Sequence, residues 1–292
     1  MPNPESRAPA LPSAARAGTL LPAALHRRSR VIIPEGAPRL EQIRSVGCQL
    51  LYQHGYAGMT MRQIAAHLQI KAASLYHHYP SKQDILFDIM YTTAMELTQG
   101  LLRIEASVQG APAQLDAAIR WHVLFHTRRQ LEAFVSHSEL RSLSPENLRS
   151  ILNVRRGYDA IFMELLNRCQ REGIIPRRDT SLTRNFILTM CTATAGWFNP
   201  QGKLTAAEVA DRAADFVWQG LLSAGGAADD FLPRLRKQRV EHSGWFQDVL
   251  EGHPAPPVQR KPDPILEWLR AEIKRRKNAA PPQAPHPKAL AP

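Results

Sequence analysis

Apolar residues recur at intervals of three and four along most of this chain, which is the spacing of one face of an α-helix. The first such segment runs from Arg39 to about His54. Its apolar face is predicted to hold Leu40, Ile43, Gly47, Leu50 and Leu51. Gly55 follows as a predicted helix stop. The helical pattern continues to Gly225 without a convincing strand, so we expect an all-α fold.

Residues 60–86 predict two short helices joined by a tight turn and followed by a longer helix. Thr60 and Gln63 have the spacing of a capping box, in which each side chain bonds a free backbone amide of the other. Ser81 and Asp84 open the longer helix, which we expect to reach about Ser107. This order is typical of a helix–turn–helix unit, whose second helix enters the major groove of DNA.

The region 111–225 predicts helices at about 112–130, 131–142, 145–172, 180–198 and 205–223. Ser144-Pro145-Glu146 is a strong helix start, and Thr205 with Glu208 forms a second capping box. The last two helices carry more apolar side chains than one buried face needs, so we expect a homodimer interface there. These side chains are Phe186, Ile187, Met190, Trp197, Phe216, Val217 and Leu221.

The patterns divide the chain into four parts. Residues 1–38 are rich in Pro and Ala and are predicted to be a disordered basic arm. Residues 39–86 form the DNA-binding domain, and residues 87–225 form a helical ligand-binding and dimerisation domain. Residues 226–292 are an extension with short helices within 231–250, an amphipathic helix at 264–277 and a Pro-rich tail.

The net charge of +11 is concentrated toward the ends of the chain. Residues 1–38 carry 5 Arg and 2 Glu, and residues 226–292 carry 12 basic and 8 acidic residues. A polyanionic partner such as DNA accounts for this excess, and so does simple solubilisation. No run of 18 apolar residues or signal peptide is present, which predicts no membrane span. Three widely separated cysteines suit reduced thiols in a cytoplasmic protein.

The sequence holds no pattern of an enzyme. It lacks a Gly-rich phosphate loop, a nucleophile elbow and paired catalytic carboxylates, so we expect no catalytic residues and no cofactor. His122 and His126 are four residues apart and could supply two metal ligands. No third ligand is evident, so we expect no metal site.

Residues 39–86 carry a set of motif positions at fixed spacings: Ile43, Gly55-Tyr56, Thr60, Ile64-Ala65, Leu75-Tyr76, Ser81-Lys82 and Leu86. In these positions the chain resembles the TetR-type (TetR/AcrR) transcriptional regulators. The resemblance implies a dimer with an N-terminal DNA-binding domain and a helical C-terminal domain that binds a small molecule. Most members are repressors that leave DNA when this effector binds.

Two positions depart from the family pattern. Gln69 stands where the turn usually has Gly, so a left-handed backbone conformation is expected at a cost of roughly 1 kcal/mol. Lys71 stands where the recognition helix usually opens with Ser or Thr. Lysine cannot cap a helix, but it can contact a phosphate or a guanine edge.

The C-terminal half has its own motif positions: Glu139, Arg141, Leu143-Ser144, Gly173-Ile174, Asp179, the stretch 196–202 and Thr205. They resemble a subgroup of these regulators associated with acyl-CoA effectors and with fatty-acid, sterol or aromatic-acid catabolism. In some members of this subgroup an Arg and a second Trp serve the ligand. The matching positions here are Leu188 and Thr192.

The DNA-binding residues divide by expected role. A helix N-terminus, a phenol and an ammonium suit phosphate, which favours Thr60, Tyr76 and Lys82. Small and polar side chains at the start of the recognition helix are expected nearest the base edges. The full predicted set is Thr60, Arg62, Lys71, Ala72, Ala73, Ser74, Tyr76, His77 and Lys82. Tyr79 is expected to be a core aromatic.

Aromatic side chains at helical spacing could line an effector cavity, although plain core packing is the alternative. The candidates are Trp121, Phe125, Phe134, Tyr158, Phe162, Phe186 and Trp197. Arg155 and Arg156 could meet an anionic ligand or simply be solvated. The leading hypothesis is a ligand-responsive repressor. The alternative is a largely non-specific DNA-binding or co-regulator protein driven by its basic tails, which salt dependence would distinguish.

Overall fold

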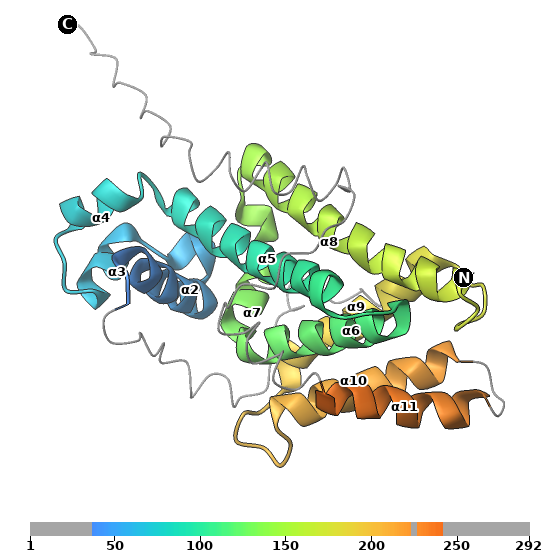
Figure 1. The fold of residues 1–292 in the computed structure, drawn as a ribbon. Helices are drawn as coiled ribbons and strands as arrows, with labels where there is room; N and C mark the ends of the chain where they lie inside the picture. The colour runs from blue at the N-terminus through green and yellow to red at the C-terminus, as the bar shows by residue number, and fades with distance from the viewer. Residues whose placement is uncertain (1–36, 223–226, 242–292) are drawn as a thin grey trace, which may run out of the picture.

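The computed structural model describes residues 37–222 and 227–241, and these residues contain helices and no strand (Figure 1). The prediction of an all-α fold is therefore confirmed. The elements are α2 (Arg39–Gly58), α3 (Met61–His67), α4 (Ala72–His78), α5 (Lys82–Ser107), α6 (Ala111–Arg128), α7 (Gln130–Ser138), the 3-10 turn η1 (Leu140–Ser142), α8 (Pro145–Arg171), α9 (Thr180–Trp197), α10 (Ala206–Leu221) and α11 (Ala227–Glu241).

Local sequence signals account for the helix–turn–helix unit formed by α2, α3 and α4. The Thr60 hydroxyl accepts a hydrogen bond from the Gln63 amide, and the Gln63 side chain accepts one from the Thr60 amide, which confirms the capping box. Gln69 has a φ of 53°, the left-handed conformation expected for the turn. Gly55, with a φ of 65°, interrupts α2 where a stop was predicted. The placement of Leu40 on the buried face was wrong, because 44% of its surface is exposed.

Helix α5 connects the helix–turn–helix unit to the rest of the protein. Its 26 residues begin after the N-cap Ser81 and run through the expected domain boundary at residue 86. The apolar core of α2–α4 includes the start of α5, and it also takes in Val135 of α7 and Ile151 of α8. The DNA-binding unit and the C-terminal helices therefore share buried side chains.

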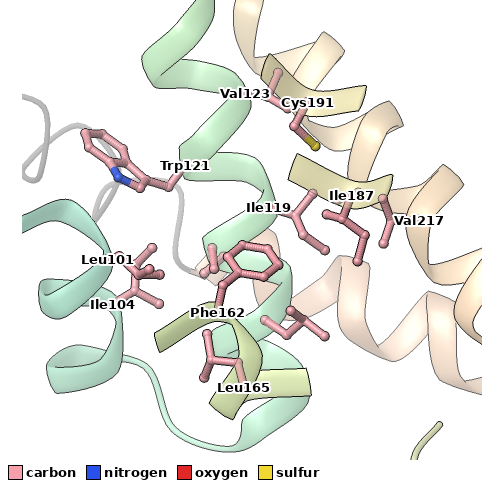
Figure 2. Close-up of a cluster of buried hydrophobic side chains, with 14 of the residues drawn as sticks. Leu101, Ile104, Ile119, Trp121, Val123, Phe162, Leu165, Ile187, Cys191 and Val217 are labelled. Carbon is pink, nitrogen blue, oxygen red and sulfur yellow. The ribbon is translucent and has the colours of Figure 1, made fainter. Parts of the chain in front are cut away.

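Helix α6 is the centre of the larger core, and α5, α8, α9 and α10 pack around it (Figure 2). Leu101 and Ile104 of α5 face it from one side, and Ile187 of α9 faces it from another. At Gly100 the two helices α5 and α6 approach closely. An added Cβ there would lie 2.1 Å from the Trp121 ring, so only glycine fits this crossing without movement.

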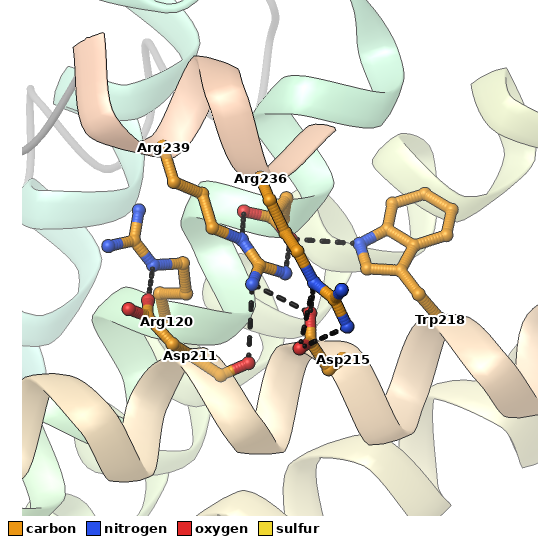
Figure 3. A network of polar contacts seen from close by, with 7 residues as sticks. Arg120, Asp211, Asp215, Trp218, Arg236 and Arg239 are labelled. Atoms are coloured by element: carbon orange, nitrogen blue, oxygen red, sulfur yellow. Dashed lines mark hydrogen bonds and ion pairs between the residues drawn. The ribbon is translucent and has the colours of Figure 1, made fainter. Parts of the chain in front are cut away.

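Helix α11 packs on α6 and α10 through the buried Leu235 and through charged groups (Figure 3). Arg239 bonds both carboxylate oxygens of Asp116 and also pairs with Asp215. Asp116 accepts a further hydrogen bond from the Trp218 indole. The sequence predicted short helices within 231–250, and α11 begins four residues earlier, at Ala227. The predicted arm 1–38 largely, and the helix 264–277 wholly, lie outside the described residues.

Among the described helices, none combines the length and apolar character that crossing a lipid bilayer requires. Cys48, Cys169 and Cys191 are buried free thiols. Burial raises the pKa of each thiol, so these cysteines are poor nucleophiles at neutral pH.

Candidate DNA interface and effector cavity

The second helix of the helix–turn–helix unit, α4, is held by one side and free on the other. Leu75 anchors it in the core and is fully buried. The opposite side exposes Lys71, Ala73, Ser74, Tyr76 and His77, while Ala72 is half-buried. Tyr76 leaves 52% of its surface exposed although it is aromatic. That these residues contact DNA remains a prediction.

The remaining predicted DNA contacts lie beside α4. Thr60 and Arg62 are exposed at the start of α3. The Lys82 ammonium donates to the carbonyl oxygens of Tyr56 and Met59, at 2.8 and 3.3 Å, and lies 4.4 Å from the centre of the Tyr56 ring. Lys82 therefore fastens the end of α2 to α5, and only its third N–H is uncommitted for a phosphate.

Tyr79 is a core residue, as the sequence predicted. Its surface is 6% exposed, and its hydroxyl donates a short hydrogen bond to Asp88. Arg44 pairs with the same carboxylate at 3.2 Å. These contacts tie α2, the end of α4 and α5 together, so the orientation of α4 depends on that of α5.

A cavity of about 220 Å³ lies among α5, α6, α7, α8 and α9. Its wall is partly apolar, with Met90, Leu97, Phe125, Val154 and Leu188 among the lining side chains. The polar lining is contributed by Thr93, Thr98, His122, His126, Ser136, His137, Arg155, Tyr158, Asp159 and Thr192. An apolar enclosure with a few convergent polar groups is the usual form of a small-molecule site.

The predicted aromatic residues do not all meet at this cavity. Phe125 and Tyr158 line it. Trp121 and Phe162 are buried in the core instead, and Phe134 packs edge-on against Tyr52. Phe186 and Trp197 are 68% and 55% exposed and lie away from it. Two of the seven candidates therefore line this cavity and five do not, because helical spacing alone does not show which neighbour a face meets.

The polar wall is built on two histidines of α6. His122 Nδ1 lies 2.8 Å from the Tyr158 hydroxyl, and His122 Nε2 lies 2.8 Å from the Thr192 hydroxyl. The His126 ring stacks on His122 with a centroid separation of 4.2 Å. From the sequence these histidines were considered only as metal ligands, and their place in a cavity wall was not predicted. Their i, i+4 spacing, with the apolar Val123, Leu124 and Phe125 between them, was the available signal.

Within residues 37–222 and 227–241, no three His, Cys, Asp or Glu side chains are grouped as metal ligands. The histidines are instead neutral buried groups. Burial lowers the pKa of His122 well below its ordinary value, and burial lowers the pKa of His126 to about 4. Both rings are therefore uncharged at neutral pH.

Arg155 is the cation nearest to these rings in the cavity wall. Its guanidinium donates to the Ser136 carbonyl oxygen at 2.7 Å, and burial lowers its pKa. Arg156, the next residue along α8, is exposed. The structure thus separates the two arginines that were candidates for an anionic ligand: Arg155 lines the cavity and Arg156 faces solvent.

A second hollow, of about 380 Å³, lies on the outer face of α9 and α10. Leu182, Phe186 and Phe216 leave 50%, 68% and 67% of their surfaces exposed there. Met190 and Val217 form part of its floor. This face exposes large apolar side chains together, which is uncommon on a protein that remains a monomer.

The fold and the exposed second helix define the class of a helix–turn–helix DNA-binding protein. The family model for bacterial regulatory proteins of the tetR family matches residues 43–89, and the model for a tetracyclin repressor-like C-terminal domain matches residues 109–221. The chain belongs to the TetR family. It is a DNA-binding transcriptional regulator and not an enzyme.

Individual relatives are distant. The HTH-type transcriptional repressor KstR2 of Mycobacterium tuberculosis H37Rv is 22% identical over 196 residues, which cover 64% of this chain and 94% of the relative. The structure of that ketosteroid regulator has a TM-score of 0.60 at 21% identity, covering 66% of this chain and all of that one. AibR, in complex with isovaleryl coenzyme A and operator DNA, has a TM-score of 0.56 at 27% identity, covering 61% of this chain and 97% of that one.

Proposed function

We propose that this regulator is a homodimeric repressor that leaves its operator when a small molecule enters the cavity among α5–α9. The observation that carries the proposal is the course of α5. Met90 and Thr93 of this helix line the cavity, and Ile85 and Leu86 of the same helix are buried in the core of the DNA-binding unit. A ligand that displaces α5 therefore moves the unit that holds α4.

The release follows from linkage between two sites. Two recognition helices of a dimer must stand about 34–36 Å apart to enter successive major grooves. An effector lowers DNA affinity only if it binds more tightly to the arrangement in which that spacing is lost. Tyr79, Asp88 and Arg44 support this coupling because they join the DNA-binding unit to α5.

The α9–α10 face is the proposed dimer interface. Burying Leu182, Phe186 and Phe216 against a second copy would remove the largest exposed apolar side chains of this face from water. Apolar burial stabilises association by about 25 cal/mol per Å² before the costs of ordering. A two-fold contact of this face with itself is a closed arrangement, as most homodimers have.

An acyl-CoA thioester is the first effector to test. Its support is AibR, whose complex contains isovaleryl coenzyme A. The cavity of about 220 Å³ is smaller than the range of about 300–1,000 Å³ typical for drug-sized ligands. It therefore suits the acyl part of such a molecule, with the nucleotide part outside.

The test is fluorescence anisotropy on DNA from immediately upstream of the gene, at physiological salt, with and without a panel of acyl-CoA thioesters. Tight binding that one thioester releases supports the whole proposal. Tight binding that no thioester alters keeps the regulator and removes this effector class. Binding that collapses at physiological salt on every sequence contradicts a specific operator and favours the non-specific alternative.

A further inference from the structure

The cavity holds one hydroxyl proton that the protein does not use. Tyr158, neutral His122 and Thr192 carry one O–H, one N–H and one O–H, and two hydrogen bonds join them. In one His122 tautomer the Tyr158 proton is left over, and in the other the Thr192 proton is left over. Neither hydroxyl has another partner among the described residues. A ligand atom that accepts a hydrogen bond would complete the chain.

The same wall holds an unused acceptor. His126 Nδ1 lies 2.9 Å from the His122 carbonyl oxygen, and a carbonyl only accepts, so Nδ1 carries the proton. The Nε2 atom of neutral His126 is then an acceptor. It has no hydrogen-bond partner in the part of the chain that the structure describes, and the ring lines the cavity. A ligand group beside this Nε2 atom must either donate a hydrogen bond to it or cause His126 to take up a proton.

Arg155 adds a cation whose hydrogen bond goes to the neutral Ser136 carbonyl. It forms no ion pair within 4 Å among the described residues, and the charge of Asp159 acts on it from farther away. Asp159 faces the same cavity, but Arg184 pairs with it at 3.0 Å. His137 at the rim donates from Nδ1 to the Ala133 carbonyl and is neutral at pH 7, since burial lowers its pKa. Arg155 and Asp159 are therefore the charged groups of the polar wall, and Arg184 neutralises Asp159 from outside the lining.

We propose that the cavity recognises the carboxyl group of a short apolar acid, with His126 taking up one proton as the acid binds. The proposal rests on the proposed function, because it assigns the effector to the same cavity. One carboxylate oxygen would accept from the free hydroxyl of Tyr158 or Thr192 and would face Arg155. The other would accept from the new Nε2–H of His126. The proton comes from solvent, and no covalent bond forms or breaks.

The proton uptake follows from the charges. A carboxylate oxygen opposite the lone pair of neutral His126 would be repelled, whereas imidazolium attracts it. Burial holds the pKa of His126 at about 4 in the empty cavity, and a bound carboxylate raises this pKa. Affinity for the acid should therefore weaken as pH rises from about 6 to 8, approaching ten-fold per unit for one proton.

The carboxyl group can come from two sources, a free acid or the far end of a dicarboxylic acyl-CoA. The probes are hexanoate, phenylacetate and benzoate, their methyl esters and their CoA thioesters, together with glutaryl-CoA, which keeps a free carboxyl. Isothermal titration in two buffers of different ionisation enthalpy measures both affinity and the number of protons taken up. We expect an acid or glutaryl-CoA to bind with uptake of close to one proton, and its ester-masked counterpart to bind at least ten-fold more weakly.

The variants are Arg155→Gln and His126→Phe, with Arg156→Gln as the matched control on the exposed side of α8. The first two should weaken the acid at least ten-fold, because each loses a charge-assisted hydrogen bond, and the control should not. Circular dichroism confirms that each variant is folded.

Three results would overturn the proposal: esters that bind as well as acids, zero proton uptake on binding, or equal affinities of R155Q and R156Q for the acid. CoA thioesters without a carboxyl in their acyl group that release DNA, while every carboxyl probe fails to bind, overturn it but leave the proposed function standing. If no probe binds or releases DNA, both effector assignments fail.

Discussion

Arg239 of α11 and Asp116 of α6 form a buried ion pair across 123 residues of sequence, with Nη2 2.6 Å from Oδ1. Their side chains are 7% and 4% exposed. Replacing Arg239 by Met leaves the Asp116 carboxylate buried with the hydrogen bond from the Trp218 indole. Removing one partner of a buried pair typically costs about 3–5 kcal/mol. We expect urea unfolding of R239M to show a loss of this size.

The matched control is Arg236, which lies on the same helix and pairs with Asp215 at 2.8 Å, but is 50% exposed. Solvent screens such a pair, so R236M should lose no more than about 1 kcal/mol. A loss in R239M as small as that in R236M would contradict the prediction and show that the buried pair contributes little to stability.

Gly100 and Trp121 give a second prediction, on the crossing of α5 and α6. Gly100→Ala places a Cβ 2.1 Å from the Trp121 ring, which must shift and give up its hydrogen bond to the Leu97 carbonyl. Overpacking of this kind costs about 1–3 kcal/mol. Trp121→Phe makes room, so G100A should cost less in that background. A double-mutant cycle of thermal unfolding measures the difference, and additive costs would contradict the proposed clash.

Features that depend on a few adjacent residues could be predicted from the sequence. The capping boxes at Thr60 and Thr205 depend on backbone groups one turn away, and both are present. The approximate bounds of most helices could be predicted for the same reason, because caps and stops lie close to the residues they bound. The left-handed Gln69 followed instead from the family resemblance, in which Gly usually stands at this turn. The Asp116–Arg239 pair had no such signal, because its partners are brought together only by the docking of α11 on α6 and α10.

The candidate cavity was harder to predict than the helices around it. Periodicity indicates that Phe125 and Phe186 each lie on an apolar stripe, but it does not show whether that stripe meets a cavity, another helix or solvent. Phe125 lines the cavity, whereas Phe186 is exposed. His122 acquires its role only through Tyr158 and Thr192, which lie 36 and 70 residues away.

The buried histidines predict a dependence of stability on pH. His126 has a folded-state pKa of about 4 against 6.5 for the ordinary group, so it is neutral when folded and gains a proton on unfolding at mildly acid pH. Stability should therefore fall as pH decreases from about 7 to 4, by about 3 kcal/mol for this group. In urea unfolding at a series of pH values, His126→Phe should show a shallower loss than the parent. Parallel curves would contradict the assignment of His126 as a neutral buried group.

If the exposed α9–α10 face is the dimer interface, a charged side chain introduced there should abolish dimer formation. Phe186→Asp places a carboxylate in the centre of the proposed interface, where it would be buried without a partner. Sedimentation velocity should then show a monomer with unchanged helical circular dichroism. Lys203→Asp makes a comparable change at an exposed site outside this hollow, and it should remain a dimer. A dimeric F186D would place the interface elsewhere.

The exposed side of α4 predicts two kinds of defect in DNA binding. Lys71 is exposed at the N-cap and makes no side-chain cap. If Lys71 contacts a phosphate, K71A should weaken binding to all DNA sequences alike and reduce the slope of log affinity against log salt concentration by about 1. If it contacts a guanine, K71A should cost about 1–3 kcal/mol of binding free energy on the operator and relax the sequence specificity.

Tyr76→Phe removes only a hydroxyl, so it should weaken DNA binding by the contribution of one hydrogen bond, about 0.5–1.5 kcal/mol. Anisotropy against operator and scrambled DNA at several salt concentrations separates these cases, with K203A as the control for lost charge. Unaltered affinity in both K71A and Y76F would exclude α4 as the helix that reads DNA.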